Sequence, residues 1–284
     1  MHRPYRIAAI RFLNPAPLMW DFEHPPLNTV LSARYQVDWM LPAECAERLA
    51  AGTAQIGLVP IAALATDPEL RILPGCTIAS KGNVRSLLLV RRAHQALQDL
   101  RSVAADTASR TTVTYARILF HKWGNPHVPF VPMAADLDAM LEHADAAIII
   151  GDPALLALEE RMNREERTGE KLVYHDLAAE WRVLTGLPFV SAVWGATVSN
   201  AELDRVAEDL IGSRDHGLAH IDSLVDEWTN RIPVPSDTIR AYLTTNIHYT
   251  LDDECIEGIR GFFRMAAEAG VLQRYEPAMA AMAL

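Results

Sequence analysis

The sequence predicts an α/β protein of two lobes, and three observations support this fold class. The chain has 284 residues, which is enough for two lobes that each bury a hydrophobic core. Short apolar runs alternate with segments of helical periodicity over residues 5–66, and the alternation returns over residues 102–167. Strand-like runs near residues 90 and 193 would join the two units. We therefore expect a clam-like fold in which lobe 1 consists of residues 1–90 and 195–284 and lobe 2 of residues 91–194.

The first unit alternates strands and helices from its first residues onward. Its expected strands are 5–10, 35–40 and 56–59, and its expected helices are 18–22, 42–52 and 61–66. Helix 42–52 has Pro42 in its first turn and Gly52 at its end, which is the usual distribution of these two residues. Extended pieces follow at 70–73 and 76–79, and residues 86–90 form a strongly apolar strand. This alternation favours a parallel sheet.

The second unit repeats the pattern. Its expected strands are 102–105, 128–131 and 146–150, and its expected helices are 110–122, 135–143 and 153–167. The dense charges at 159–170 are typical of a solvated helix end, and we assign them no chemistry. After a helix capped by Asp176 and a turn at 185–188, an apolar strand covers 189–198. The remaining helices, 201–228, 236–244 and 252–269, are expected to return to lobe 1.

The composition is that of an ordinary globular protein, and it argues against several partners. Half of the residues are hydrophobic, 22% are charged, the formal net charge is −10, and no block of Lys and Arg occurs. Neither nucleic acid nor a membrane surface is therefore an expected partner. The first residues contain no apolar signal-peptide core, so we expect a cytoplasmic protein, either a monomer or a homodimer. Cys45, Cys76 and Cys255 are scattered, which fits a reducing compartment and gives no metal-ligand spacing.

A polar turn at 107–112 follows an apolar strand and precedes a helix with an apolar stripe. Ser109, Thr111 and Thr112 therefore lie where a helix begins, with Arg110 between them. Unpaired backbone N–H groups and the positive end of the helix dipole make this a natural seat for a carboxylate. The alternative is plain N-capping by Ser or Thr, which is common. Arg110 could face a ligand or pair with an acid on the surface.

Other polar residues lie where strands end, which is where open α/β sheets place their ligands. Asn14 follows the first strand within a proline-rich segment, Ser86 lies beside the apolar strand 86–90, and Gly151 and Asp152 close strand 146–150. An Asx-turn before proline is the alternative for Asn14. Asp152 is the one acid in this set, and the others are neutral hydrogen-bonding groups. Such residues can hold a small anion.

Several common chemistries have no motif in this chain. There is no glycine-rich phosphate loop and no G-x-S-x-G nucleophile elbow. His216 and His220 lie four residues apart, but Gly217 follows His216, so the zinc-protease pattern is not met. We therefore expect neither a metal nor an organic cofactor.

Segments spread along the chain resemble the chorismate dehydratases of menaquinone biosynthesis, the enzymes of the futalosine pathway. The resemblance covers most of the chain in order and depends on no single motif. The matching stretches are Phe12-Leu13-Asn14 before Pro17-Leu18, Val84-Arg85-Ser86, Asp106 with Ser109-Arg110-Thr111, Ile150-Gly151-Asp152, Glu180-Trp181, Thr185-Gly186-Leu187-Pro188-Phe189, Ala192-Val193-Trp194 and Glu257-Gly258-Ile259-Arg260-Gly261-Phe262-Phe263. Two departures are Arg11-Phe12, where relatives often have Ser-Tyr, and Pro15, where they often have Thr.

The resemblance implies a two-lobed periplasmic-binding-protein-like (type 2) fold, with a ligand cleft between the lobes, used as a cytoplasmic enzyme. It implies a hydro-lyase that removes water from chorismate, a dicarboxylate, to give 3-[(1-carboxyvinyl)oxy]benzoate. No protein base is evident, so we expect the side-chain carboxylate of the substrate to take the proton. Asn14 and Ser86 would be catalytic. The substrate would contact Pro60, Val84, Arg85, Ser109, Arg110, Thr111, Thr112, Gly151, Asp152 and Trp194.

Two alternatives remain at this stage. The 1,4-dihydroxy-6-naphthoate synthases of the same pathway usually open with a Ser-Pro-Cys-Pro-Asn-type segment and carry a His-Glu segment later. This chain has Phe12-Leu13-Asn14 and Gly151-Asp152-Pro153 at those places, which favours the dehydratase. A non-catalytic binding or sensor protein for a small anion could share the fold, because fold alone does not separate these functions.

Overall fold

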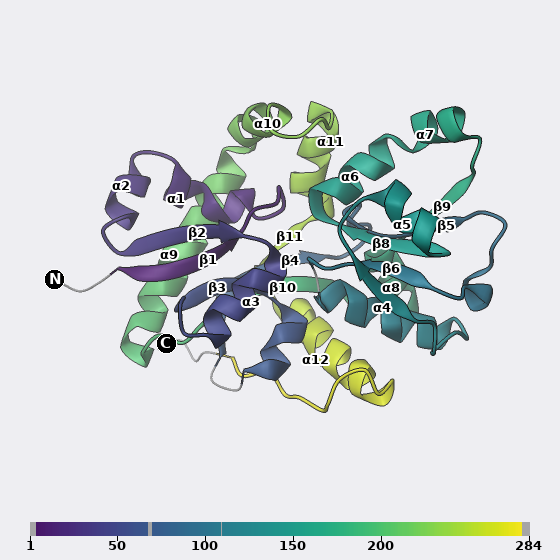
Figure 1. Ribbon diagram of the computed structural model, residues 1–284. Helices are drawn as coiled ribbons and strands as arrows, with labels where there is room; N and C mark the ends of the chain where they lie inside the picture. Colours follow the sequence, from purple (N-terminus) through teal and green to yellow (C-terminus); the bar gives the residue numbers. More distant parts are fainter. Residues whose placement is uncertain (1–3, 68–69, 109, 280–284) are drawn as a thin grey trace.

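The computed structural model describes residues 4–67, 70–108 and 110–279, and these form two α/β lobes side by side (Figure 1). The expected α/β fold with two lobes is confirmed. The first sheet has the strand order β11 (His248–Leu251), β4 (Arg71–Ser80), β10 (Phe189–Ala196), β3 (Ile56–Pro60), β1 (Tyr5–Ile10), β2 (Tyr35–Met40). The second sheet has the order β7 (Phe130–Met133), β6 (Val103–Asp106), β8 (Ala146–Ile150), β5 (Leu87–Arg92), β9 (Leu172–Asp176).

Both sheets are mixed, which corrects the expectation of a parallel sheet. The βα units do pair in parallel, because β1 lies beside β2 and β3 and β6 lies beside β7 and β8. The strands that follow a crossing between lobes are antiparallel to their neighbours. β10 pairs with β3 and β4, and β5 pairs with β8 and β9. A strand that enters a sheet from the other lobe is not the second strand of a βαβ unit within that sheet, so nothing forces it to run parallel.

The lobe boundaries follow from this pairing. The expected boundaries at 90/91 and 194/195 fall inside β5 and β10. Sheet pairing places all of β5 in the second sheet and all of β10 in the first. We therefore propose that the chain crosses between lobes at 81–86 and 177–188.

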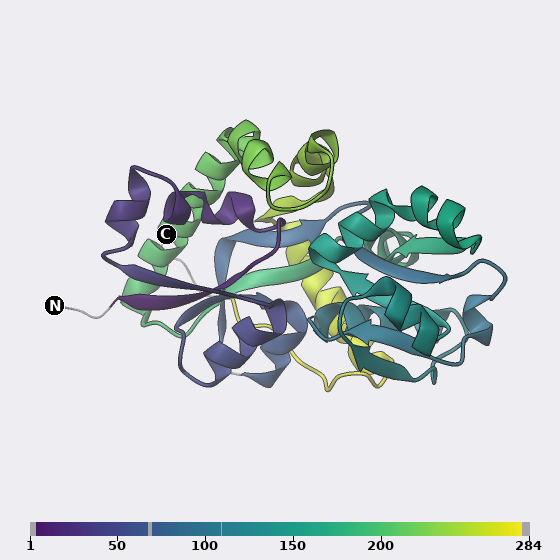
Figure 2. The same ribbon diagram turned by 45° about the horizontal axis from the view of Figure 1, so that its top comes forward.

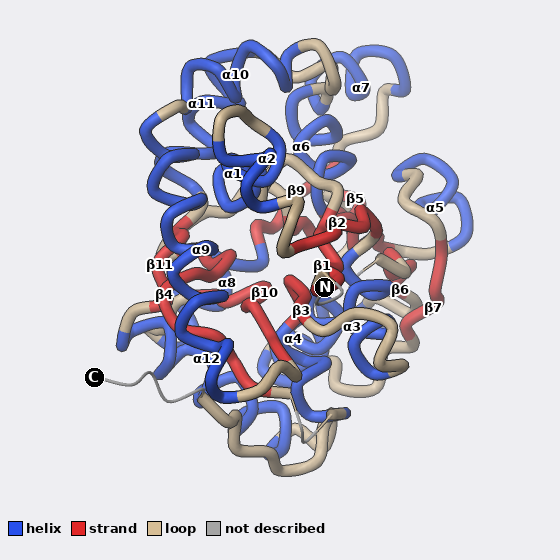
Figure 3. The backbone as a smooth tube through the Cα atoms, turned by 90° about the vertical axis from the view of Figure 1, so that its left-hand side faces the viewer, coloured by secondary structure: helices blue, strands red, loops and turns tan. Residues whose placement is uncertain are grey.

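Helices cover both sheets. The expected helix 153–167 is two helices, as is 201–228, and strand β11 was not expected. The C-terminal α9 packs on η1 and β4 of the first lobe, as predicted (Figure 3). The helices are η1 (Ala16–Met19), α1 (Trp20–Glu23), α2 (Leu27–Leu31), α3 (Pro42–Ala50), η2 (Ile61–Thr66), η3 (Leu97–Asp99), α4 (Arg110–Lys122), α5 (Leu137–His143), α6 (Gly151–Glu159), α7 (Arg161–Thr168), α8 (Leu177–Thr185), α9 (Asn200–Ala219), α10 (Ile221–Thr229), α11 (Ser236–Ala241), η4 (Tyr242–Asn246) and α12 (Asp253–Glu268). No described helix is both long enough and apolar enough to span a bilayer.

An aromatic cluster joins the lobes on one side. Helix α12 contacts both β10 and α4, and it lies between the two sheets in Figure 2. The buried ring of Tyr115 on α4 stacks on Phe189 with centroids 3.7 Å apart and meets Trp181 edge-on at 4.7 Å. The Tyr115 hydroxyl also bonds to the backbone of Val190 at 3.2 Å. Buried aromatic contacts of this kind make a stable junction between the lobes.

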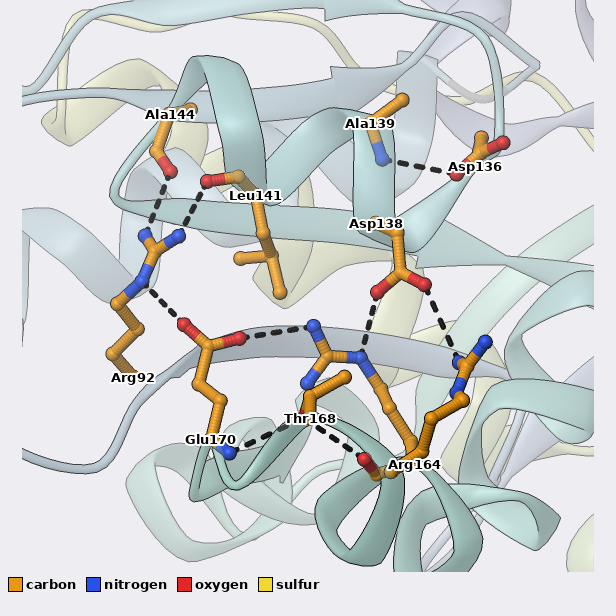
Figure 4. A network of polar contacts seen from close by, with 10 residues as sticks. Arg92, Asp136, Asp138, Ala139, Leu141, Ala144, Arg164, Thr168 and Glu170 are labelled. Carbon is orange, nitrogen blue, oxygen red and sulfur yellow. Dashed lines mark hydrogen bonds and ion pairs between the residues drawn. The ribbon is translucent and has the colours of Figure 1, made fainter.

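An ion-pair network on the second lobe accounts for much of the charged run 159–170. Glu170 accepts from Arg92 at 2.7 Å and from Arg164 at 2.9 Å, and Arg164 also reaches Asp138 at 2.7 Å (Figure 4). The Arg164 side chain is only 11% exposed, so the run is more than a solvated helix end. The network ties α7 to α5 and β5, and none of these four side chains lines the interlobe cavity described below.

Candidate functional site between the two lobes

A small cavity lies where strands of both lobes end. It measures about 40 Å³, which is room for a few water molecules and far less than the several hundred Å³ of a typical ligand pocket. The lobes must therefore separate before a substrate-sized ligand enters. The predicted residues that line it are Asn14, Pro60, Val84, Ser86, Thr112 and Gly151; the remaining lining residues are Ile10, Phe12, Pro42, Ile78, Leu87, Ile150, Ser191 and Ala192.

Asn14 presents an unsatisfied acceptor at this cavity. It follows β1 and precedes η1, where Pro15 prevents the strand from continuing. The Asn14 Oδ1 atom is buried and has no hydrogen-bond partner among the described residues. Leaving a buried polar atom unpaired costs about 1–3 kcal/mol. An oxygen kept in this condition at a cavity wall is suited to accept a hydrogen bond from a bound ligand.

Ser86 is held from two sides at the start of β5. Its side chain is buried, and its Oγ accepts a hydrogen bond from the Tyr242 hydroxyl at 2.8 Å. Its backbone carbonyl accepts from Gly151 N–H at 2.8 Å. Tyr242 was not predicted, because it lies in the C-terminal helices and no motif marks it.

Arg85 shapes the segment that carries Ser86 but sends its own side chain elsewhere. Its backbone adopts the left-handed conformation, with φ 65°, which is strained for a residue other than glycine. Its N–H donates to Asp176 at 2.7 Å, and its guanidinium pairs with Glu159 of α6. Arg85 is thus next to cavity residues without lining the cavity.

Gly151 is a point at which the lobes approach closely beside the cavity. Its φ is +67°, and a Cβ at this position would lie 2.8 Å from the Phe12 ring of the other lobe. Both the backbone conformation and the close approach require glycine. Phe12 is one of the departures from the family pattern, and its ring now forms part of the cavity wall.

Asp152 connects the lobes rather than lining the cavity. Its Oδ1 accepts a hydrogen bond from Leu13 N–H at 2.9 Å, so a second-lobe carboxylate holds a first-lobe loop. Burial raises the pKa of the Asp152 carboxyl to about 6, and this exceeds the lowering by the Leu13 hydrogen bond. The contact is therefore sensitive to pH near neutrality.

Three residues of the polar turn before α4 have different surroundings. The fourth, Ser109, lies outside the described residues. Arg110 pairs with exposed Glu47 of α3 at 3.3 Å, which corresponds to the second of the two orientations left open for it. The buried Thr111 Oγ1 accepts from Ala62 N–H of the first lobe at 3.0 Å. Thr112 is the described member of this turn that lines the cavity.

Trp194 lies in the core instead of the cavity wall. It is fully buried in β10 opposite Leu58, and its indole Nε1 has no partner among the described residues. Ser191 and Ala192 line the cavity near the start of β10, whereas Trp194 lies farther along the strand, within a register shift between Val193 and Gly195. Ser191 was not predicted, although it precedes a quoted family stretch.

Three residues near the C-terminus could in principle hold a metal ion. The ligand atoms of His248, Asp252 and Cys255 lie within 4.8 Å of one another. The Lys81 ammonium already contacts Asp252 at 2.7 Å, and burial raises the pKa of the Cys255 thiol to about 12. A competing cation and a protonated thiol argue against metal binding, and Asp252 instead caps α12 by accepting from Cys255 N–H.

Two α/β lobes with mixed sheets and a cavity between their strand ends define the periplasmic-binding-protein fold. Solved structures agree with this class. A Candida albicans protein, CA3427, described as exhibiting the generic periplasmic binding protein fold, matches with TM-score 0.64 and 12% identity over 97% of this chain and 92% of its own. The alkanesulfonate-binding protein SsuA from Xanthomonas axonopodis pv. citri, bound to MOPS, matches with TM-score 0.68 and 14% identity over 96% of both chains.

Sequence comparison is more specific than the fold. Residues 5–268 match the model of a family described as menaquinone biosynthesis, and the chain belongs to that family. A chorismate dehydratase from Thermus thermophilus is 28% identical over 269 residues, which cover 92% of this chain and 94% of that protein. The expected family and fold are thereby confirmed.

Proposed function

We propose that this protein is a chorismate dehydratase, a carbon–oxygen hydro-lyase of the futalosine route to menaquinone. The observation that carries the proposal is the buried Asn14 Oδ1, which has no partner among the described residues, at an interlobe cavity whose described lining residues all have neutral side chains. Family membership and the Thermus thermophilus relative support it. Chorismate needs orientation more than it needs strong acids or bases, because the product gains an aromatic ring.

The reaction balances as the loss of one water molecule. The C–H bond at the ether-bearing ring carbon breaks, and the electron pair left on carbon spreads toward the ring carboxylate. The neighbouring C–O bond then breaks, the hydroxyl takes up the proton that was removed from the ring carbon and departs as water, and the ring becomes aromatic. We propose that the enolpyruvyl carboxylate of chorismate takes the ring proton, since none of the cavity-lining side chains is an acid or a histidine.

The protein's part is to bind and polarise. Asn14 Oδ1 would accept a hydrogen bond from the hydroxyl that leaves, and Ser86 would donate to a substrate oxygen. A carboxylate would lie near Thr112 at the first turn of α4, where helix N–H groups and the dipole favour negative charge. Closure of the lobes around the substrate would exclude water. We further propose that the enzyme acts in the cytoplasm without a metal or organic cofactor.

Incubation of the purified protein with chorismate tests the proposal. We expect chorismate to disappear while an aromatic absorbance grows, and mass spectrometry should show a product lighter by one water. Asn14→Ala should suppress the conversion, whereas Asn28→Ala on α2, which does not line the cavity, should not. Binding of chorismate without conversion would favour a binding or sensor protein. The absence of both binding and conversion would overturn the proposal.

The role of the substrate carboxylate has its own test. A chorismate analogue in which the enolpyruvyl carboxylate is replaced by a neutral amide should still bind but should not lose water. Turnover of this analogue at the rate of chorismate would show that another group takes the proton.

A further inference from the structure

The C-terminal segment from η4 to α12 is fastened to the crossing segment 81–86 that carries Ser86. Asn246 Nδ2 donates to the carbonyl of Asn83 at 2.9 Å. Lys81 pairs with Asp252 at 2.7 Å and with Glu254 at 2.8 Å. The crossing segment is therefore fixed by residues more than 150 positions away in the sequence, and Tyr242 of the same C-terminal segment contacts the cavity residue Ser86 itself.

Tyr242 occupies an unusual piece of backbone. It begins η4, a single turn of π-helix, and such turns occur often at functional sites because they redirect one side chain without ending the helix. The residue is fully buried, and its hydroxyl donates to Ser86 Oγ at 2.8 Å. Burial raises the pKa of this phenol far above its ordinary value, and the Asn14 side chain is a further polar neighbour of the hydroxyl. Tyr242 thus remains a neutral donor at any working pH.

The direction of this hydrogen bond determines what Ser86 can do. A serine hydroxyl has one proton and two lone pairs. Because the Tyr242 proton occupies a lone pair of Ser86 Oγ, the Ser86 proton must point to another acceptor. Ser86 lines the cavity, so a ligand oxygen there can receive this proton. Donation by the tyrosine also polarises the serine O–H bond and makes it a better donor.

We propose that Tyr242 is a positioning residue, which orients the Ser86 hydroxyl as a hydrogen-bond donor to the substrate. The proposal rests on the proposed function in taking chorismate as that substrate. Tyr242 does not touch the reacting atoms and acts through Ser86. The sequence stretches that carry the family resemblance do not include this residue.

Kinetics of four variants test the proposal. Tyr242→Phe removes one oxygen atom, and we expect kcat for chorismate to fall on the order of tenfold while KM changes less than about twofold. Ser86→Ala should lower kcat by at least as much, and adding Tyr242→Phe to Ser86→Ala should lower it no further. Tyr249→Phe is the matched control, because this tyrosine is also buried but its hydroxyl has no partner among the described residues. Its kcat should match that of the unaltered protein.

Additive effects of the two substitutions, or a kcat for Tyr242→Phe equal to that of Tyr249→Phe, would overturn the proposal. A second measurement needs neither turnover nor a phenylalanine variant that folds. With 3-fluorotyrosine placed at position 242, the ¹⁹F resonance should shift when Ser86 is replaced by alanine, and the same label at position 249 should not respond. If the unaltered protein fails to convert chorismate, the proposed function fails while this spectroscopic result still decides whether the two hydroxyls are coupled. An unmoved resonance at position 242 would refute the coupling.

Discussion

The loops at the strand ends and the first turn of α4 both carry small polar residues near the cavity, yet they contribute different numbers of residues to its wall. At the strand ends, Asn14, Ser86 and Gly151 all line the cavity. In the first turn of α4, Thr112 lines it, while Thr111 bonds to Ala62 of the other lobe. Ser86 and Gly151 converge because antiparallel β5 and β8 meet at one edge of the second sheet, and Asn14 reaches them from the loop after β1 of the first sheet. Successive residues of a helix, in contrast, point about 100° apart. The strand-end residues therefore all line the cavity. The residues of the α4 turn are divided among the cavity wall, a contact between the lobes and the protein surface.

The largest effect should come from the strand-end set. Asn14→Ala is expected to lower kcat/KM for chorismate by roughly 5- to 150-fold, the equivalent of about 1–3 kcal/mol for losing the acceptor that orients the leaving hydroxyl. The free energy of unfolding should not fall much, because the deleted oxygen has no partner among the described residues. Steady-state kinetics and urea unfolding measure the two quantities. A near-normal kcat/KM for this variant would show that Asn14 is not part of the site, and that the strand-end residues contribute no more than the α4 turn does.

Gly151→Ala tests the close approach of the lobes, and Gly169→Ala is its control. Both glycines have left-handed backbones, with φ +67° and +68°, but a Cβ at position 169 meets nothing within 4 Å. Gly169→Ala should cost about 1–2 kcal/mol of unfolding free energy from backbone strain alone. Gly151→Ala should cost roughly 1–3 kcal/mol more and raise KM, because the Phe12 ring must move. Adding Phe12→Leu to Gly151→Ala should recover part of the additional loss of unfolding free energy. Equal losses for Gly151→Ala and Gly169→Ala would show that the contact between Gly151 and Phe12 is unimportant.

The Asp152 contact should make the lobe junction depend on pH. Burial raises the pKa of this carboxyl from 3.8 to about 6, so between these values the folded protein holds a proton that the unfolded chain has lost. The unfolding free energy therefore decreases as pH rises from about 4 to about 6, by at most about 3 kcal/mol from this group. Asp152→Asn should remove that part of the dependence. Urea unfolding of both proteins at several pH values measures this dependence. If the unfolding free energies of the two proteins changed with pH in parallel, the raised pKa of Asp152 would be contradicted.

Thr111 and Thr112 should respond to valine in different measurements. Thr111→Val leaves the Ala62 N–H without its acceptor and should cost about 1–3 kcal/mol of unfolding free energy. Thr112→Val removes a hydroxyl that lines the cavity and should mainly raise KM. The sequence alone led us to expect a marked rise in KM for Thr111→Val with folding retained. If Thr111→Val raised KM more than Thr112→Val did, that first expectation would be restored.

The smallest effect is expected for Arg110. Its ion pair with Glu47 is exposed, and pairs of this kind contribute less than about 1 kcal/mol. Arg110→Ala should leave KM within about twofold of the unaltered value, and Glu47→Ala should behave in the same way. A large rise in KM for Arg110→Ala alone would place the arginine at the substrate after all.

Local patterns in the sequence were sufficient to locate most elements of the fold. The apolar stripe and the preceding polar turn predicted α4 over 110–122, and Asp176 was expected as a cap and does accept from Ala178 and Ala179 N–H. The strand-end residues Asn14, Ser86 and Gly151 could be predicted because a strand's end is marked by proline, glycine and the loss of apolar alternation. The family resemblance then indicated which catalytic or substrate-binding role each of these residues would have.

Only the tertiary structure decided which sheet each crossing strand joins and which side chains meet. An apolar run such as 87–90 is compatible with either lobe, and its antiparallel pairing with β8 and β9 depends on strands that follow it in the chain. Tyr242 and Ser86 are separated by 156 positions, and nothing in either local sequence indicates the other. Trp194 was predicted to contact substrate and lies buried opposite Leu58, because the distance of a strand residue from the cavity depends on how the lobes pack. Periodicity in a sequence reports burial and backbone conformation, whereas the partner of a buried polar group is set by how the two lobes pack.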